Sequence, residues 1–289
     1  MNTGCIPTKT LVASPGVAYL ARRAAEFGVN VDPSVSVDMA RVKARKDEIV
    51  EASNSGVTVG LGGLLRGFRT TSGRHAYDID CEPDSTSIDG SHLLLAVGGT
   101  PNTDDLGLEN PGVQVDERGF IRVDEALRTN IDEVWAIGEV NGRGALTHNS
   151  YDDHEIVAAN LFDNDPRRTA YPILCYGLFI DPPLGRVGMT EREARASGRN
   201  VLMGRRMMPQ VGRAREIGET RGFMKILEDA DSREILGAAL LGLSGNEAVH
   251  ALLDIMYAQQ PYTVIARAVH IHPTGSELIP PVLQSLRPL

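Results

Sequence analysis

The chain has 289 residues, a formal net charge of −9, and 42% hydrophobic against 23% charged residues. This length suits one large or two ordinary domains, and the composition is that of a globular protein. A negative net charge offers no field that attracts phosphates, which argues against nucleic acid or a membrane surface as a partner. No apolar run reaches the ~18 residues needed to cross a bilayer, and the first residues lack the hydrophobic core of a signal peptide.

Three cysteines, Cys5, Cys81 and Cys175, are scattered along the chain. They do not make the disulfide framework of a small secreted domain. We therefore expect a cytoplasmic protein, because thiols stay reduced in that compartment.

The first part of the chain is predicted to be helical. Apolar residues at helical spacing favour a helix over residues 10–27, with Gly28 as its stop. Pro15 lies inside this segment and predicts a kink or a late start, because proline removes a backbone hydrogen bond. A second helix is expected over residues 37–53, and residues 66–90 form a polar, turn-rich segment with little periodicity.

Two short apolar runs predict strands of a parallel sheet. Residues 92–97 form one run, ahead of Gly98 and Gly99, and residues 134–138 repeat the pattern. Continuous apolar runs of this length suit strands that are covered on both faces. A helix is expected to follow over residues 151–161.

The chain changes character after a predicted linker at residues 165–168. Strand and helix signals there predict an α+β domain, in which an antiparallel sheet has helices on one side. The spacing Thr190-x-x-Glu193 is a capping box, and Ser244 opens another helix with apolar residues on one face. Strands are expected at four places, namely 173–180, 201–208, 223–227 and 235–241.

Cys5 is the first candidate for chemistry, because it lies at the start of a predicted helical region. Unpaired backbone N–H groups at a helix N-terminus favour a thiolate, and Lys9 adds positive charge. A buried, inert cysteine is the alternative interpretation of the same spacing.

Gly138 and Glu139 end the second apolar run and are the next candidates. A carboxylate at the carboxyl edge of a sheet can accept hydrogen bonds from a ribose or ribitol hydroxyl. The alternative interpretation is a strand that simply ends in a polar turn.

The segment from His270 to Glu277 is the third candidate. The capping-box spacing Thr274-x-x-Glu277 would place Glu277 in a first helical turn, within reach of a histidine before it. A carboxylate fixes the tautomer of an imidazole and raises its basicity, as an acid/base pair requires. One alternative is a metal site at His270 and His272, which has no third ligand nearby in sequence, and another is a histidine with a purely structural hydrogen bond.

Four segments, in this order, resemble motifs of the class I pyridine-nucleotide–disulfide oxidoreductases, the family of dihydrolipoamide dehydrogenase, glutathione reductase and mercuric reductase. The segments are Asn2 to Lys9, Pro101 to Leu108, Thr129 to Val140, and His272-Pro273-Thr274 with Glu277.

Within that family, the chain is most similar to mercuric-reductase-like proteins of bacteria. The segments that carry this likeness are 144–148, 179–188 and 269–274. A true mercuric reductase would carry a C-terminal cysteine pair, and this chain ends without one. The retention of His272 favours an organic disulfide, a quinone or a similar small-molecule electron acceptor over mercuric ion.

The resemblance implies that electrons pass from NAD(P)H through FAD and a cysteine pair to the acceptor. Cys5 would be the flavin-proximal thiolate. His272 and Glu277 would form the acid/base pair, contributed across a homodimer that the C-terminal domain holds together. The residues implied to contact FAD are Lys9, Gly138, Glu139, Ala145, Leu146 and Thr147.

The resemblance also implies a shortened chain. The second cysteine of the redox motif would lie ahead of Met1, as would the first FAD fingerprint. The NAD(P)H domain is expected to be largely missing around residues 69–91, where a short polar segment stands. Gly99 stands where the family usually has arginine, and Glu139 stands where it usually has the FAD-binding aspartate.

The predicted fold is an α/β remnant of an FAD-binding domain over residues 1–165, followed by an α+β dimerisation domain with an antiparallel sheet over residues 166–289. FAD pyrophosphate normally sits on the helix of the first fingerprint, so its loss is expected to weaken cofactor binding. Cys5 alone cannot form an internal disulfide. Two alternatives to an active oxidoreductase therefore stay open, a non-catalytic dimerisation module and a truncated gene product without redox activity.

Overall fold

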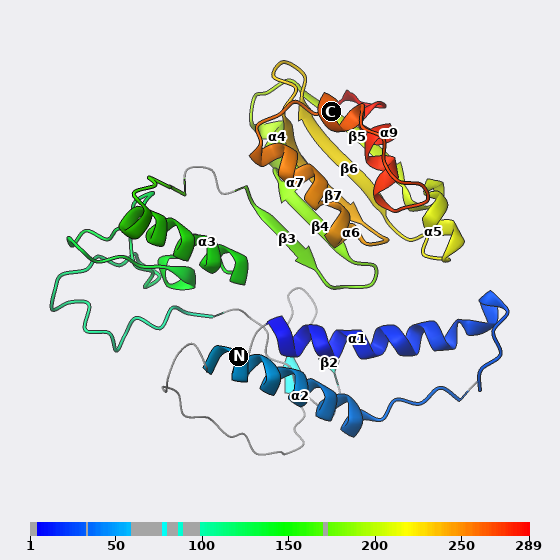
Figure 1. The fold of residues 1–289 in the computed structure, drawn as a ribbon, viewed down its shortest axis with the longest axis horizontal. Coiled ribbons are helices and arrows are strands. Elements are labelled where there is room, and N and C mark those ends of the chain that lie inside the picture. The colour runs from blue at the N-terminus through cyan, green and yellow to red at the C-terminus, as the bar shows by residue number, and fades with distance from the viewer. Residues whose placement is uncertain (1–4, 33, 59–76, 80–85, 89–98, 170–172) are drawn as a thin grey trace. The chain divides into compact units, whose positions relative to one another are not determined.

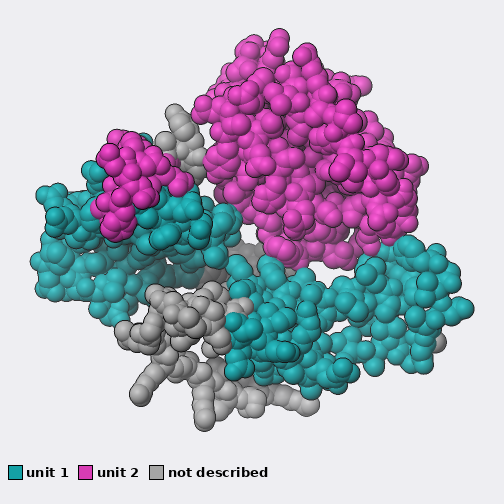
Figure 2. All heavy atoms as spheres, viewed as in Figure 1, with its two compact units in different colours: residues 1–158 teal, residues 159–289 magenta. Residues whose placement is uncertain are grey.

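The computed structural model describes residues 5–32, 34–58, 77–79, 86–88, 99–169 and 173–289. The chain forms two compact units, residues 1–158 and residues 159–289 (Figure 2). Among the described residues, no helix combines the length and the apolar character that crossing a membrane requires. The predicted boundary between residues 165 and 166 stays a prediction.

The first unit begins with helix α1, Cys5–Arg22, which continues as a 3₁₀ turn over Ala24–Phe27. The helix begins five residues before its predicted start and runs through Pro15, so the expected late start is wrong. Pro7 is tolerated because N–H groups in a first helical turn have no partner to lose. Gly28 ends the segment as predicted, with a φ of 73° that suits glycine.

Helix α2, Met39–Thr58, lies beside α1, and the two form a helical hairpin (Figure 1). The Asp38 carboxylate accepts hydrogen bonds from the backbone N–H groups of Ala40 and Arg41 at 3.0 and 3.1 Å. This capping explains why the helix begins two residues after the predicted position. Beyond it, β1 (Tyr77–Ile79) and β2 (Thr86–Ile88) pair as antiparallel strands.

The predicted strand over residues 134–138 is wrong. Trp135 makes one isolated antiparallel bridge, to Arg128, and Gly138–Asn141 is a 3₁₀ turn. An apolar run becomes a parallel strand only where neighbouring strands pair with it along its length. The other predicted strand, 92–97, lies outside the described residues.

Helix α3, Thr147–Ala158, follows the 3₁₀ turn and is succeeded by a π-helical turn, Ala159–Asp163. It begins four residues before its predicted start. The Leu146 carbonyl accepts hydrogen bonds from the N–H groups of Asn149 and Ser150, which begins the helical pattern there.

The second unit contains a six-stranded, fully antiparallel sheet in the order β3-β4-β7-β6-β5-β8 (Figure 1). The strand bounds are β3 Cys175–Leu178, β4 Leu184–Gly188, β5 Val201–Met207, β6 Phe223–Asp229, β7 Ile235–Leu241 and β8 Arg287–Pro288. The four predicted strands are confirmed. The sequence did not predict β4 or β8.

Helices cover this sheet as expected for an α+β domain. Figure 1 shows α7 and α9 against the sheet, and both contact its central strands. The helix bounds are α4 Glu191–Ala196, α5 Gly212–Glu216, α6 Gly245–Ala248, α7 His250–Tyr257, α8 Thr263–Ala266 and α9 Ile279–Leu283. The capping box is confirmed at α4, where the Thr190 hydroxyl accepts from the Glu193 N–H at 3.1 Å and the Glu193 carboxylate accepts from the Thr190 N–H at 2.6 Å.

The main core lies between the sheet and α5 to α9. Its members that are fully buried include Val187, Met208, Met224, Ile226, Leu240, Leu252 and Ile279. Leu227 follows Ile226 on β6 and points to the other face, because side chains alternate along a strand. There it packs with Ala194 of α4, so a smaller second cluster covers part of that face.

Candidate functional site

Cys5 and Thr147 are brought together, although 142 residues separate them. Cys5 is the first residue of α1 and Thr147 the first residue of α3, and both are exposed. The Cys5 Sγ lies 3.3 Å from the Thr147 Oγ1. Lys9 lies one helical turn beyond Cys5, on the same face of α1. The thiol forms no disulfide among the described residues, and either the thiol or the hydroxyl can donate the hydrogen in this contact.

A cavity of about 420 Å³ lies in the same unit. Its lining residues are Gly99, Thr100, Pro101, Asn102, Arg118, Phe120, Glu139, Val140, Gly142, Gly144 and Ala145. The volume falls within the range of small-molecule sites. Of the predicted cofactor residues, Glu139 and Ala145 line this cavity, whereas Gly138, Leu146, Thr147 and Lys9 do not.

Asp153 holds the turn that presents Glu139. Its buried carboxylate accepts hydrogen bonds from the Gly138 N–H at 2.8 Å and from the Asn141 Nδ2 at 2.7 Å. Gly138 has a φ of 78°, a conformation that favours glycine. The Glu139 side chain is thereby left exposed beside the cavity, without a hydrogen-bond partner among the described residues.

Sequence reasoning missed Asp153. The sequence signal is the spacing of Asp153 three residues before the apolar Ile156 in a predicted helix. The structure shows that Ile156 is the most deeply buried residue of α3. Helical spacing therefore places an acidic residue on the buried face, where it needs a partner.

His272 and Glu277 are paired as predicted. The His272 Nδ1 lies 2.7 Å from the Glu277 Oε2. A carboxylate accepts the hydrogen bond, so Nδ1 carries the proton, and in the neutral imidazole Nε2 is left with a free lone pair. The His272 side chain is 78% exposed and that of Glu277 is 11% exposed. The partly buried Glu277 carboxylate holds the His272 ring. The other ring nitrogen, Nε2, is thereby accessible to a reactant.

The predicted capping box at Thr274 is wrong. The Thr274 hydroxyl donates to the Ile271 carbonyl at 2.7 Å, and the short 3₁₀ turn Ser276–Leu278 has Gly275 before it. The carboxylate that the box would use is instead bound to His272. The described part of the chain contains no group of three or more histidine, cysteine or acidic side chains placed to hold an ion.

Both halves of the chain match one family. Residues 20–153 match the pyridine nucleotide-disulphide oxidoreductases, and residues 175–282 match the dimerisation domain of the same enzymes. The chain belongs to the pyridine nucleotide-disulphide oxidoreductase family. The resemblance predicted from the motifs is thus confirmed.

Two curated relatives show the extent of the similarity. The chain is 35% identical over 204 residues to the probable pyridine nucleotide-disulfide oxidoreductase RclA of Escherichia coli, covering 70% of the chain and 46% of that protein. It is 31% identical over 287 residues to dihydrolipoyl dehydrogenase 2 of Haloarcula marismortui, covering 95% of the chain and 59% of that protein. The chain therefore spans about half of the length of the relatives that it matches.

A solved structure gives the same result. The flavoprotein disulfide reductase RclA from Escherichia coli, described as induced by HOCl, aligns with a TM-score of 0.67 and 34% identity, over 73% of this chain and 48% of that one. The fold class and the flavoprotein family are thereby confirmed. The more specific likeness to mercuric reductases stays a prediction.

We expect the contact between Cys5 and Thr147 to control the reactivity of the thiol. Replacing Thr147 with valine keeps the size of the side chain and removes the hydroxyl. Alkylation of Cys5 by iodoacetamide should slow by roughly threefold to tenfold, the effect of one lost hydrogen bond. Peptide mass spectrometry measures this rate, with Cys175 of the same chain as the reference. An unchanged rate at Cys5 would show that the hydroxyl does not act on the sulfur.

Proposed function

We propose that this chain acts as an FAD-dependent oxidoreductase of the disulfide-reductase type, with NAD(P)H as electron donor. The observation that carries the proposal is the contact between the Cys5 Sγ and the Thr147 hydroxyl, because Thr147 follows Ala145, the last residue that lines the cavity, by two positions. Relatives described as flavoproteins and as dihydrolipoyl dehydrogenases support it.

The residues around the cavity fit part of a flavin dinucleotide. The exposed Glu139 carboxylate accepts hydrogen bonds and suits the hydroxyls of a ribitol chain. Gly142 and Gly144 leave the cavity wall without side chains, and a Cβ at either position would lie under 3.0 Å from Phe120 or Asn149. Bound FAD would supply the capacity to accept a hydride and to pass electrons to a disulfide.

This chain's own residues would divide the remaining work. Cys5 would act as the thiolate nearest the flavin. His272 would hold and release a proton at Nε2, because Glu277 fixes the proton on Nδ1. A small-molecule electron acceptor, an organic disulfide or a quinone, fits a histidine this exposed. The other predicted cofactor residues would contact FAD, namely Lys9, Gly138, Ala145, Leu146 and Thr147.

We further propose a homodimer formed through the C-terminal unit, because residues 175–282 match a dimerisation domain. Each subunit would then supply His272 and Glu277 to its partner. A reducing cytoplasm suits the cysteines Cys5 and Cys175, which form no disulfide within the described residues.

The visible absorption spectrum of the purified protein, recorded before and after FAD is added, tests the proposal. A flavin spectrum perturbed by the protein, followed by flavin-dependent oxidation of NADH with a quinone or disulfide acceptor, is the expected result. Protein that takes up no FAD, or that binds it without any turnover in excess cofactor, would instead favour a dimerisation scaffold without this chemistry.

The role of Glu139 gives a sharper expectation. Replacing Glu139 with alanine removes the only predicted acceptor for a ribitol hydroxyl, so FAD affinity should fall by roughly tenfold, the effect of a hydrogen bond to a charged group. Fluorescence titration with FAD measures the change. The matched control is Glu109→Ala, an exposed carboxylate outside the cavity lining, which should leave the affinity unchanged. Equal affinity of wild type and the Glu139 variant would remove this residue from the site.

A further inference from the structure

The loop that carries His272 has little apolar packing of its own. Val269 is 99% exposed and Ile271 is 80% exposed, and the His272 side chain itself faces solvent. An exposed loop of this kind samples many conformations unless polar contacts restrain it. The position of His272 therefore depends on hydrogen bonds within the loop.

Two hydrogen bonds within the loop join residues before His272 to residues after it. The His270 Nδ1 lies 3.1 Å from the Ser276 carbonyl oxygen, and the Thr274 hydroxyl donates to the Ile271 carbonyl at 2.7 Å. A carbonyl oxygen only accepts, so the His270 Nδ1 carries the proton. The bond joins the residue two positions before His272 to the residue just before Glu277.

The Ser276 end of this bond is fixed to the core. Gly275 packs closely on Leu243, since a Cβ at Gly275 would lie 3.2 Å from the Leu243 carbonyl. Beyond Ser276, the chain continues through Leu278 into α9, whose Ile279 is fully buried. The His270 ring thus ties the exposed arm of the loop to its anchored arm.

We infer that His270 is a positioning residue for His272. By holding the two arms together, it keeps the His272 Nδ1 on the Glu277 carboxylate and leaves Nε2 directed outward. This inference rests on the proposed function for the use of that nitrogen in proton transfer. The hydrogen bond between His272 and Glu277 does not itself involve His270. The proposed role of His270 is therefore distinct from the pairing of His272 with Glu277.

The ring nitrogens of His272 report directly on this arrangement. In protein labelled with ¹⁵N-histidine at about pH 8, where an ordinary imidazole is neutral, the ¹⁵N shifts give the fraction of each tautomer. Wild type should show His272 mainly with the proton on Nδ1. In His270→Ala, the tautomer ratio should move toward the Nε2–H form by roughly fivefold, the effect of one lost hydrogen bond.

His270→Asn is the conservative variant. An asparagine side-chain amide can donate to the Ser276 carbonyl from nearly the same position, so this variant should restore the wild-type ratio. A matched control is His250→Ala, an exposed histidine on α7, which should not change it. A stabilising role alone would alter unfolding without altering the tautomer of His272 in the folded protein.

The outcomes separate the inference from the proposed function, because the tautomer is measured without flavin or substrate. The role of His270 would be overturned, even in an active enzyme, if the tautomer ratio of His272 were unchanged in folded His270→Ala. It would also be overturned if the ratio shifted in His270→Ala and stayed shifted in His270→Asn. If His270→Ala fails to fold, Thr274→Val removes the second loop bond, together with the 3.4 Å contact between the Thr274 and Ser276 hydroxyls. This variant should shift the same ratio in the same direction. An unchanged ratio there would likewise overturn the idea that the loop bonds position His272.

Discussion

We expect Gly204→Ala to lower the free energy of unfolding of the C-terminal unit by about 3 kcal/mol, at the upper end of the usual cost of overpacking. A Cβ at Gly204 would lie 2.4 Å from the carbonyl oxygen of Val282 and 2.8 Å from its Cγ1. Neither the strand that carries Gly204 nor the helix that carries Val282 can move readily. Strand β5 is paired on both edges, with β6 and β8, and Val282 of α9 is fully buried.

The same substitution should also disturb the candidate site. Glu277 lies in the 3₁₀ turn that runs directly into α9, so a helix lifted from β5 carries the carboxylate away from His272. Unfolding in guanidinium, followed by far-UV circular dichroism, measures the stability. In the folded Gly204→Ala variant, the fraction of His272 with its proton on Nδ1 should also be lower than in wild type.

Gly212→Ala is the matched control for this prediction. A Cβ there would meet only the Glu277 Oε1, at 4.0 Å, which is an ordinary contact. The change should stay within about 0.5 kcal/mol of wild type. If both alanine variants were equally stable, α9 would not be held against β5 at this close approach.

Strands with strong local patterns could be predicted from the sequence. β6 and β7 lie in the centre of the sheet, and the mostly apolar stretches 223–227 and 235–241 predict their positions from local sequence. β4 could not be predicted, because it contains Gly185 and Gly188 and has weak strand propensity. It forms because β3 and β7 pair with it on both sides, and such pairing depends on residues far away in sequence.

The same contrast holds for the site. The pairing of His272 with Glu277 could be predicted because the two residues are five positions apart, although the expected capping box is wrong. The contact of Cys5 with Thr147, and the hold of Asp153 on Gly138, join separate segments. Local patterns identify candidate residues, but long-range packing decides which of them meet.

Glu228 is expected to make the stability of the C-terminal unit depend on pH. Its side chain is 1% exposed, and its Oε2 has no hydrogen-bond partner among the described residues. Burial raises the pKa of Glu228 from 4.5 to about 7, with a further contribution from the negative charge of Asp229, while Arg233 acts in the opposite direction. The folded state therefore favours the protonated form.

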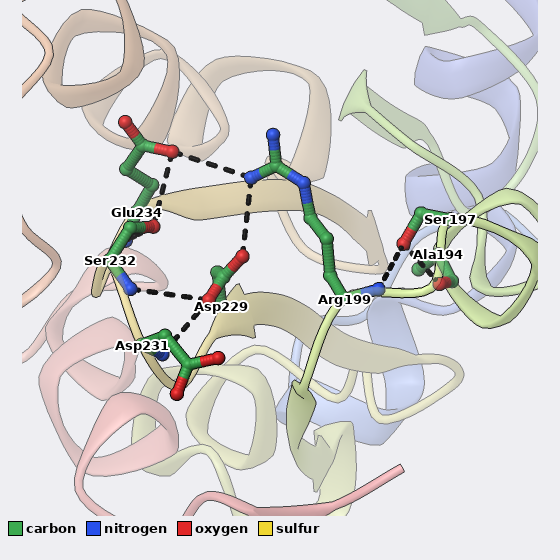
Figure 3. Close-up of polar contacts among 7 residues, drawn as sticks. All are labelled: Ala194, Ser197, Arg199, Asp229, Asp231, Ser232 and Glu234. Atoms are coloured by element: carbon green, nitrogen blue, oxygen red, sulfur yellow. Dashed lines mark hydrogen bonds and ion pairs between the residues drawn. The ribbon is translucent and has the colours of Figure 1, made fainter.

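Asp229 keeps its charge beside Glu228 because its surroundings favour the carboxylate. Its oxygens accept from the N–H groups of Asp231 and Ser232 at 2.9 and 3.2 Å, and one of them lies 3.2 Å from the Arg199 Nη1 (Figure 3). These contacts hold the pKa of Asp229 below its ordinary value, with the Asp231 N–H as the largest cause. Neutralising Glu228 is thus the way to relieve the repulsion between the two carboxyl groups.

The sign of the effect follows from proton binding. Between pH 4.5 and about 7 the folded state holds a proton on Glu228 that the unfolded state has released, so stability falls as pH rises through this window. Replacing Glu228 with glutamine removes the ionisation. We expect the variant to be more stable than wild type by about 2–3 kcal/mol at pH 8, and the difference to shrink strongly toward pH 5.

Guanidinium unfolding at the two pH values measures this difference, with Glu234→Gln as the matched control. Glu234 lies on the same hairpin, but its side chain is 52% exposed and its contact with Arg199 is 3.4 Å long. An exposed ion pair contributes ~0–1 kcal/mol, so the control should show little dependence on pH. If Glu228→Gln gave the same difference from wild type at both pH values, the carboxyl would be charged in the folded protein throughout.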